Sequence, residues 1–426
     1  MLVSLLGLVT VSGIGVNALD VGVAKLPVLG YNTWNFYQCD ISEKLIVETA
    51  TLMRKFGLQA AGYNYVNIDD CWSLKNRSKT GELVADPVKF PSGIKNLTDT
   101  LHKMGFKAGI YSDAGWFTCG GFPGSYSYEL KQTFSDWGID YLKYDNCAIP
   151  YDSITRQGVY GRYTPMRDAL IAVARKAKKI PIVFSLCEWG WNQVWVWGKE
   201  VGQSWRTTGD IAPTWPSLAH IINFNSFITS STDYYGRNDL DMLQIGNGNL
   251  TYEEKKSHWT AWALMKSPLF IGTNLSAITP DTLSILTNRE ILAINQDPVY
   301  GESISPFRWG LNPDWSFNAT HPAQYWSGRS QNGTVVMMLN TLDEPAEMSF
   351  NLTESPWIRA GRKYSIRDLW SHTNNGTAVR NITRTVPAHG VLALLLKDAG
   401  NEPAGLYPEC SVWWQCTDKN GTRVGG

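Results

Sequence analysis

The stretch Ile139-Asp140-Tyr141-Leu142-Lys143-Tyr144-Asp145-Asn146-Cys147 is a largely apolar run that ends in an acid. Side chains alternate between the two faces of a strand, so a strand here places Lys143 and Asp145 on the same face. A nearby ammonium group favours the ionised carboxylate and lowers its pKa. On this stretch alone a structural ion pair explains the pattern. If the pattern recurs along the chain, Asp145 becomes a candidate nucleophile.

Short apolar runs that end in polar residues do recur between residues 27 and 300. We expect buried strands at 63–68, 106–111, 141–144, 182–186 and 269–271, with helices such as 43–56 and 164–178 between them. Alternating strands and helices form βα units around a parallel sheet. The polar residues at or after the strand ends are Asp69-Asp70, Tyr111, Lys143 to Asp145, Cys187-Glu188, Arg206 with Asp210, and Asp241.

These polar strand ends decide between two parallel architectures. A (β/α)₈ barrel brings the carboxyl ends of all its strands to one face, where the separated groups would share a pocket. A doubly wound open sheet, the alternative, gathers such residues only at a switch point. Because so many strand ends carry polar groups, we predict an α/β fold of the (β/α)₈ TIM barrel type.

The helical pattern disappears after about residue 300. The segments 335–339, 348–352 and 391–396 are expected strands separated by Asn, Gly, Asp and Pro, which indicates a small antiparallel β domain. We therefore divide the chain into a barrel at 19–300, an antiparallel β domain at 301–397 and a tail at 398–426. Cys410 and Cys416 bracket Ser-Val-Trp-Trp-Gln and are expected to close a small loop in this tail.

The first 18 residues carry no charge and are mostly apolar, and Val16-Asn17-Ala18 offers small residues for cleavage. We predict a secretory signal peptide cleaved near Ala18, although its start lacks the usual Lys or Arg; a buried N-terminal segment is the alternative. No other run approaches the length that spans a bilayer. Sequons for N-glycosylation also favour a secreted glycoprotein. They lie at Asn76, Asn96, Asn249, Asn274, Asn318, Asn332, Asn351, Asn375, Asn381 and Asn420.

Composition narrows the classes of partner and cofactor. Lys plus Arg and Asp plus Glu are equal at 38 each, so the chain lacks the basic footprint of a nucleic-acid or anionic-membrane binder. The six histidines stand apart and no cysteine pair has CxxC spacing, so we expect neither a metal nor another cofactor. Seven cysteines in an exported chain predict disulfides with one thiol left over.

Two carboxyl groups across a sugar-sized pocket are the minimal equipment for hydrolysing a glycosidic bond. One must be ionised while the other carries a proton. Asp145 is the candidate anion. Asp210 is the candidate proton carrier, because the apolar neighbours around its Gly-containing turn would raise its pKa. An N-cap of a helix that begins near Pro213 is the alternative role for Asp210.

Seven segments also resemble a known family. They are Gly30-Tyr31-Asn32-Thr33-Trp34-Asn35, Asn67-Ile68-Asp69-Asp70-Cys71-Trp72, Gly109-Ile110-Tyr111-Ser112-Asp113, Leu142-Lys143-Tyr144-Asp145-Asn146-Cys147, Cys187-Glu188-Trp189-Gly190, Trp205-Arg206-Thr207-Thr208-Gly209-Asp210-Ile211 and Ala293-Ile294-Asn295-Gln296-Asp297-Pro298. Together they resemble the α-galactosidases, or melibiases, of glycoside hydrolase family 27, in the same order and over roughly residues 25–395. Tyr364 to Trp370 and Pro387-Ala388-His389-Gly390 extend the resemblance. It implies a retaining hydrolase with a (β/α)₈ barrel followed by an antiparallel β-sandwich.

The resemblance also implies individual roles. Asp145 would be the nucleophile and Asp210 the acid/base, with carboxyl groups about 5–5.5 Å apart. Residues implied to line a galactose pocket are Trp34, Asp69, Asp70, Tyr111, Cys119, Lys143, Glu188, Trp191, Arg206 and Asp241. Implied disulfides are Cys39–Cys71 and Cys119–Cys147, which leaves Cys187 free at the pocket wall. The implied partner is an α-galactoside oligosaccharide or polysaccharide, attacked at its non-reducing end by a secreted exo-acting enzyme.

Specificity within the family rests on a few positions. Glu188 and Trp191 would leave no room for an N-acetyl group, which disfavours α-N-acetylgalactosaminidase activity. Intact Asp69 and Asp70 argue for galactose and against a β-L-arabinopyranosidase. A galactose-binding protein without turnover is the third alternative.

The chain departs from the family's pattern in two places, at Tyr31 and in the stretch Tyr234 to Met242. Tyr31 stands where the family usually has Trp. Arg237 and Leu240 are expected near the rim, where they would alter the preference for the aglycone.

Overall fold

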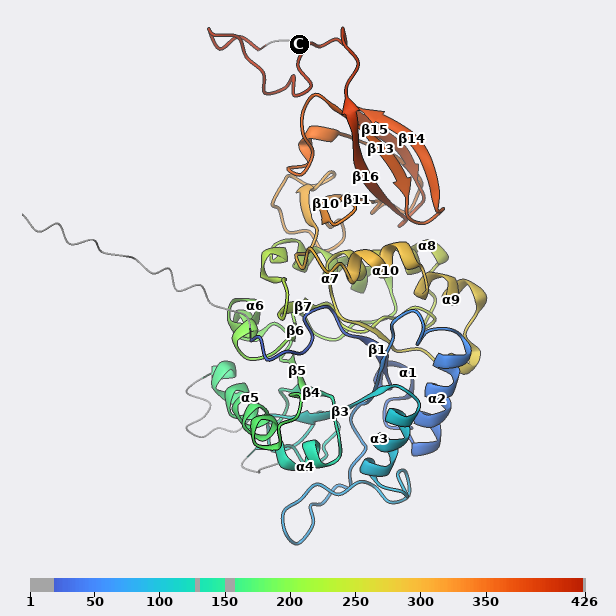
Figure 1. Ribbon diagram of the computed structural model, residues 1–426, viewed down its shortest axis with the longest axis vertical. Helices are drawn as coiled ribbons and strands as arrows, with labels where there is room; N and C mark the ends of the chain where they lie inside the picture. Colours follow the sequence, from blue (N-terminus) through green and yellow to red (C-terminus); the bar gives the residue numbers. More distant parts are fainter. Residues whose placement is uncertain (1–18, 127–130, 150–157, 424–426) are drawn as a thin grey trace, which may run out of the picture.

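Figure 1 shows the computed structural model, which describes residues 19–126, 131–149 and 158–423. The expected signal peptide at 1–18 lies outside the described residues. Two bodies follow one another along the chain: a ring of strands and helices, and an all-β domain stacked on one side of that ring (Figure 1). Among the described residues, no helix is both long and apolar enough to cross a membrane.

The ring is a parallel barrel in the order β7-β6-β5-β4-β3-β2-β1-β8. Leu243, after β7, forms a parallel bridge with Ile271 of β8 and thereby closes the circle. Its strands are β1 (Leu29–Asn32), β2 (Tyr65–Ile68), β3 (Lys107–Asp113), β4 (Tyr141–Asp145), β5 (Val183–Cys187), β6 (Ser204–Arg206), β7 (Arg237–Asp239) and β8 (Leu269–Ile271). The predicted (β/α)₈ barrel is confirmed.

Helices surround the barrel and connect its strands. They are α1 (Trp34–Tyr37), α2 (Glu43–Lys55), α3 (Ile94–Lys103), α4 (Lys131–Asp136), α5 (Gly158–Ala177), α6 (Val194–Trp197), α7 (Trp215–Ser226), α8 (Tyr252–Leu264), α9 (Pro280–Leu286) and α10 (Arg289–Asn295). Helix α8 begins with a capping box, in which Thr251 and Glu254 satisfy each other's backbone amides. Such caps satisfy amides that the first helical turn leaves unpaired.

Alternation along the strands builds two apolar layers. Val66, Leu142 and Phe184 point outward and join the core between the sheet and its helices. Their neighbours point inward and fill the barrel together with residues of other strands. This interior cluster consists of Val28, Tyr65, Tyr141, Val183, Met242 and Phe270. The polar strand ends lie beyond this filling, at the carboxyl face.

The all-β domain has a six-stranded antiparallel sheet, β14-β13-β16-β11-β10-β9, and a two-stranded sheet, β12-β15. Its strands are β9 (Ser305–Arg308), β10 (Tyr325–Ser330), β11 (Gly333–Leu339), β12 (Ala346–Asn351), β13 (Arg362–Asp368), β14 (Thr373–Val379), β15 (Asn381–Val386) and β16 (Val391–Asn401). Val335, Met337 and Leu339 belong to the core shared with the barrel. Val336 and Met338 alternate with them and join the core between the two sheets. The predicted β-sandwich is therefore confirmed.

The structure contains the three predicted disulfides, Cys39–Cys71, Cys119–Cys147 and Cys410–Cys416. Strand β16 continues past the expected domain end at residue 397, because Asn401 pairs with Arg362 of β13. The last of these disulfides lies in the tail beyond this strand.

The expectation that Arg237 and Leu240 lie at the rim is wrong. Arg237 begins β7, at the end of the barrel opposite the carboxyl face, and donates to the carbonyl oxygens of Ala24 and Lys25 at 2.8 Å. Leu240 is fully buried in the core. Tyr31, the other departure, is also buried and donates to the carbonyl oxygen of Thr273. The residues at both departures are therefore buried and take part in packing.

Candidate active site

A cavity of about 290 Å³ opens at the carboxyl ends of the barrel strands. It is lined by Trp34, Asn35, Gln38, Asp69, Asp70, Tyr111, Cys119, Lys143, Asp145, Trp189, Arg206, Asp210, Ile211, Ala212, Pro213, Asp241, Met242 and Gln244. Ten of the twelve sequence-derived site residues are among them. Glu188 and Trp191 are the two that do not line it.

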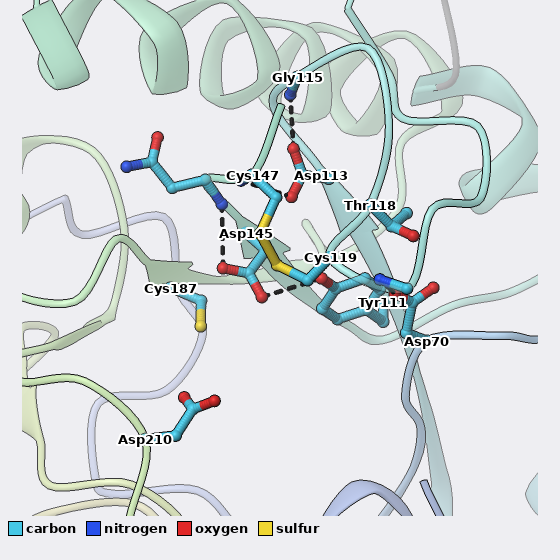
Figure 2. Close-up of a disulfide and its surroundings, with 12 residues drawn as sticks. Asp70, Tyr111, Asp113, Gly115, Thr118, Cys119, Asp145, Cys147, Cys187 and Asp210 are labelled. Carbon is cyan, nitrogen blue, oxygen red and sulfur yellow. Dashed lines mark hydrogen bonds between the residues drawn. A yellow bond between two sulfur atoms is a disulfide. The ribbon is translucent and has the colours of Figure 1, made fainter. Parts of the chain in front are cut away.

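Asp145 is fixed in the cavity wall by donors on both of its oxygens. The Tyr111 hydroxyl donates to Oδ2 and the backbone N–H of Asn146 donates to Oδ1, each at 2.9 Å (Figure 2). The strand register explains the first contact, since Tyr111 on β3 pairs with Lys143 on β4, two residues before Asp145. The arrangement holds the carboxylate in one orientation and leaves it facing the cavity.

Lys143 does not make the expected contact with Asp145. Its Nζ pairs with Asp69 Oδ2 at 2.9 Å, and the side chain of Asp69 is almost wholly buried. The expected lowering of the Asp145 pKa is also wrong: burial raises that pKa, and Lys143, the Tyr111 hydroxyl and other donors offset the effect only in part. The reason is geometric, because the ammonium group is engaged by another acid while Asp145 is only 6% exposed.

Asp210 lies across the cavity from Asp145 (Figure 2), on the loop after β6. Arg206 pairs with Asp210 at 3.0 Å and with Asp241 at 2.8 Å, so it joins two acids of the wall. The prediction of a raised pKa for Asp210 is wrong. Partial burial raises this pKa, but Arg206 and Lys143 more than offset it, and the net shift is downward. The Asp210 side chain is 73% exposed, so the expected apolar surroundings do not shield it.

The remaining wall residues are anchored by backbone amides and by the disulfide. Asp70 accepts from the backbone N–H groups of Cys71 at 2.7 Å and Gly120 at 2.8 Å. Burial nevertheless raises the pKa of Asp70. The Cys119–Cys147 disulfide ties the loop after β3 to the residues that follow Asp145 (Figure 2). The wall thus offers several fixed acceptors to a polyhydroxylated ligand.

Glu188 and Trp191 lie apart from the cavity wall. Cys187 ends β5, so the next side chain, Glu188, points to the opposite face of the strand and is fully buried. Burial raises the Glu188 pKa well above its usual value. Trp189 takes the place on the wall, and its ring contacts the half-exposed Trp191 edge to face at 5.8 Å. The alternation of side chains along β5 is the signal in the sequence that could have shown that Glu188 points away from the cavity.

Two further residues differ from expectation or were missed. Cys187 is a free thiol as expected, but it is buried below the cavity instead of forming its wall. Asp113 was missed as a site residue, although it pairs with Asp145 in the register of β3 and β4. Its oxygens accept from the backbone N–H groups of Gly115 at 2.6 Å and Cys147 at 2.9 Å. Burial, with the charge of Asp145, raises the pKa of Asp113 to about 8.

Comparison with known proteins adds independent findings. Residues 27–297 match the family model described as alpha galactosidase A, and residues 320–396 match the alpha galactosidase C-terminal beta sandwich domain. The chain is 42% identical over 422 residues to the Talaromyces emersonii protein named "Probable alpha-galactosidase B", covering 88% of this chain and 93% of that protein.

Two solved structures are also similar. Alpha-galactosidase I from Mortierella vinacea superposes with a TM-score of 0.82 at 37% identity, covering 90% of this chain and 100% of that one. A Saccharomyces cerevisiae α-galactosidase solved with raffinose gives a TM-score of 0.79 at 30% identity, covering 89% of this chain and 99% of that one.

Proposed function

The chain belongs to the α-galactosidases (melibiases) of glycoside hydrolase family 27, and we propose that it is a secreted, exo-acting enzyme that removes terminal α-D-galactosyl residues with retention of configuration. The observation that carries the proposal is the pair of acids in one sugar-sized cavity. Asp145 is held on the wall by two donors, and Asp210 lies opposite on a loop. Raffinose in the Saccharomyces cerevisiae relative supports galacto-oligosaccharides as substrates.

In the proposed double displacement, Asp145 attacks the anomeric carbon as the glycosidic C–O bond breaks, and Asp210 gives its proton to the leaving oxygen. Water then attacks the same carbon and gives a proton to Asp210 while the bond to Asp145 breaks. Two inversions make α-galactose the first product. An NMR time course that detects β-galactose first would contradict retention.

The pKa shifts of Asp145 and Asp210 require that the protonation of these two acids changes before this mechanism begins. Asp145 has a raised pKa and Asp210 a lowered one, which is the reverse of the order that the first step uses. A sugar ring in the cavity displaces water from the exposed side chain of Asp210, and desolvation raises a carboxyl pKa. We propose that substrate binding raises the pKa of Asp210 so that its carboxylate takes up a proton from solvent before the first step.

The same pKa directions favour a second candidate mechanism, in which Asp210 attacks and Asp145 supplies the proton. An activated fluorogalactoside that traps the covalent intermediate distinguishes the two. Mass spectrometry should find the label on the peptide that contains Asp145, and a label on Asp210 would establish the exchanged roles. No label, together with equal near-zero turnover of p-nitrophenyl α-galactoside by the wild type and Asp145→Asn, would indicate a galactose-binding protein.

Specificity at the 2-position needs its own test, because Glu188 is not on the wall. We propose that Trp189 restricts the space there and that the enzyme prefers galactose to N-acetylgalactosamine. We expect kcat/KM at least about 100-fold higher for p-nitrophenyl α-galactoside than for the N-acetylgalactosaminide. The β-L-arabinopyranoside should also be a poorer substrate, since Asp69 and Asp70 line the cavity and their fixed oxygens can accept hydrogen bonds from a 6-hydroxymethyl group that arabinose lacks.

A further inference from the structure

His389, in the loop between β15 and β16, reaches from the β-sandwich onto the barrel. Its ring stacks on that of Trp215, with centroids 4.2 Å apart and planes inclined by 15°. Trp215 is the first residue of α7 and is buried. The acid/base Asp210 lies only five residues before it in the chain. A side chain of the second domain therefore abuts the segment that carries a catalytic group.

Four further contacts hold the imidazole and its backbone in place. Nδ1 lies 2.9 Å from Glu254 Oε1 of α8, and Nε2 lies 3.0 Å from Asp343 Oδ1 of the loop between β11 and β12. Ser257 donates to the carbonyl oxygen of His389 at 2.6 Å, and the N–H of His389 donates to the carbonyl oxygen of Leu342. Glu254 is itself fixed, because its other oxygen belongs to the capping box of α8. The ring is thus a rigid support for Trp215.

The acid/base segment, defined here as residues 210–214, is anchored mainly at its Asp210 end, where Arg206 pairs with Asp210 at 3.0 Å and Gln244 Nε2 donates to the carbonyl oxygen of Ile211 at 3.3 Å. Ile211 N–H donates to Asp241 Oδ2 and Ala212 N–H donates to Ser217 Oγ, each at 2.9 Å. Thr214, at the N-cap of α7, makes no side-chain hydrogen bond to the helix. The orientation of the segment at its end in α7 therefore depends on how the first turn of the helix packs, and His389 packs against that turn.

We propose that His389 is a positioning residue for general acid catalysis: its stacked ring fixes Trp215 and thereby holds Asp210 where the leaving oxygen needs a proton. The inference rests on the proposed role of Asp210. It also assigns a purpose to the Pro387-Ala388-His389-Gly390 motif, which the catalytic cavity does not use. The β-sandwich then contributes directly to the chemistry of the barrel.

Leaving-group dependence isolates this role. A dinitrophenyl leaving group departs without a proton, whereas the sugar that leaves melibiose needs one. His389→Ala should lower kcat/KM for melibiose at least about 10-fold and leave the dinitrophenyl α-galactoside within about twofold, because small misplacements of a catalytic group are costly only where the group acts. An equal fall with both substrates, or no fall with either, would overturn the proposal.

Further variants separate stacking from ion pairing and from folding. His389→Phe keeps a ring on Trp215 and should retain most melibiose activity, whereas Trp215→Leu should reproduce the selective loss and Trp215→Phe should rescue it. Trp370→Phe is the matched control, since it removes another hydrogen bond between the domains, to Thr260, far along the chain from residues 210–214. It should affect both substrates alike.

Asp210→Ala is the reference for the proposed function. Its kcat/KM should fall steeply for melibiose and little for the dinitrophenyl galactoside. If Asp210→Ala lacks this selectivity, the acid/base assignment is wrong and the inference falls with it. If Asp210→Ala is selective and His389→Ala is not, the inference alone is wrong.

Discussion

Lys143 on β4 and Asp69, which follows β2, form an ion pair with 2.9 Å between Nζ and Oδ2. The pair spans the intervening strand β3 and holds two strand ends of the cavity together. Burial alone would lower the pKa of Lys143, but Asp69 and other acidic neighbours raise it well above its usual value. A permanent cation therefore stands beside Asp145, the proposed nucleophile, without forming a hydrogen bond to it.

Removing this cation should impair catalysis and shift its pH dependence. We expect Lys143→Met to lower kcat/KM at least about 100-fold, because it leaves the buried Asp69 unpaired and disturbs the wall. The pKa of Asp145 should rise further, since Lys143 lowers it, so the acid limb of kcat/KM should move to higher pH. Lys107→Met, at the opposite end of the barrel on β3, is the control and should leave the profile unchanged. An unshifted acid limb in Lys143→Met would refute the electrostatic role.

Asp113 makes stability depend on pH. Its pKa is about 8 in the folded protein, far above the ordinary value for an unfolded aspartate, so the folded state retains a proton that the unfolded state has lost. Stability is therefore greatest below about pH 4 for this group and falls by about 1.4 kcal/mol per pH unit until about pH 8. Thermal unfolding across this range should show Tm decreasing with pH.

Asp113→Asn tests the assignment. The variant should be less stable throughout, because one backbone N–H would face an amide NH₂, but its Tm should vary less between pH 4 and pH 8. The same slope in the variant and the wild type would show that another group causes it.

The disulfides should differ in importance although each ties a loop. Replacing Cys119 and Cys147 by Ser should cost about 3–4 kcal/mol of stability from loop entropy and also most of the activity, since Cys119 lines the cavity and Cys147 follows Asp145 closely. Replacing Cys410 and Cys416 in the tail should leave kcat/KM unchanged. Equal activity of the two double variants would contradict a role for Cys119–Cys147 in shaping the site.

Two glycines, one near Asp145 and one near Asp210, allow a matched comparison of substitutions. A Cβ on Gly115 would lie 2.0 Å from the carbonyl oxygen of Cys147, so Gly115→Ala must displace the chain just after Asp145. We expect kcat to fall at least about 10-fold. Gly209 is adjacent to Asp210, but a Cβ there would meet nothing within 4 Å, so Gly209→Ala should be close to neutral. Steady-state kinetics of both variants check the comparison.

The barrel could be predicted because its signal repeats. Most strands are short and have polar residues at or just after their ends, and only a closed sheet brings so many such ends together. The same logic gathered eight cavity residues, including Asp145, Asp210 and Asp241, whereas Trp34 and Cys119 were implied only by the family resemblance. Their chain separations are large, but their positions at strand ends are local properties that the sequence displays.

The charge states could not be predicted in the same way. Lys143 and Asp145 do lie near each other, yet the choice of Asp69 as the hydrogen-bonding partner depends on how β2 and β4 sit around β3. The downward shift at Asp210 likewise arises from Arg206, whose reach depends on the loop after β6. Such shifts follow from distances of a few ångströms, which residue patterns do not determine.

The six-stranded sheet of the second domain contributes to two hydrophobic cores. Val335 and Met337 face the core shared with the barrel, and Val336 and Met338 face the core between the two sheets. A fragment that ends before this sheet would expose the apolar surface of α8 and α10. A fragment that begins after the barrel would expose the apolar face of the sheet. Neither domain can therefore be transferred to another protein on its own. Exchange of domains between relatives should succeed only when the barrel surface and the sheet surface that pack against each other are exchanged as a pair.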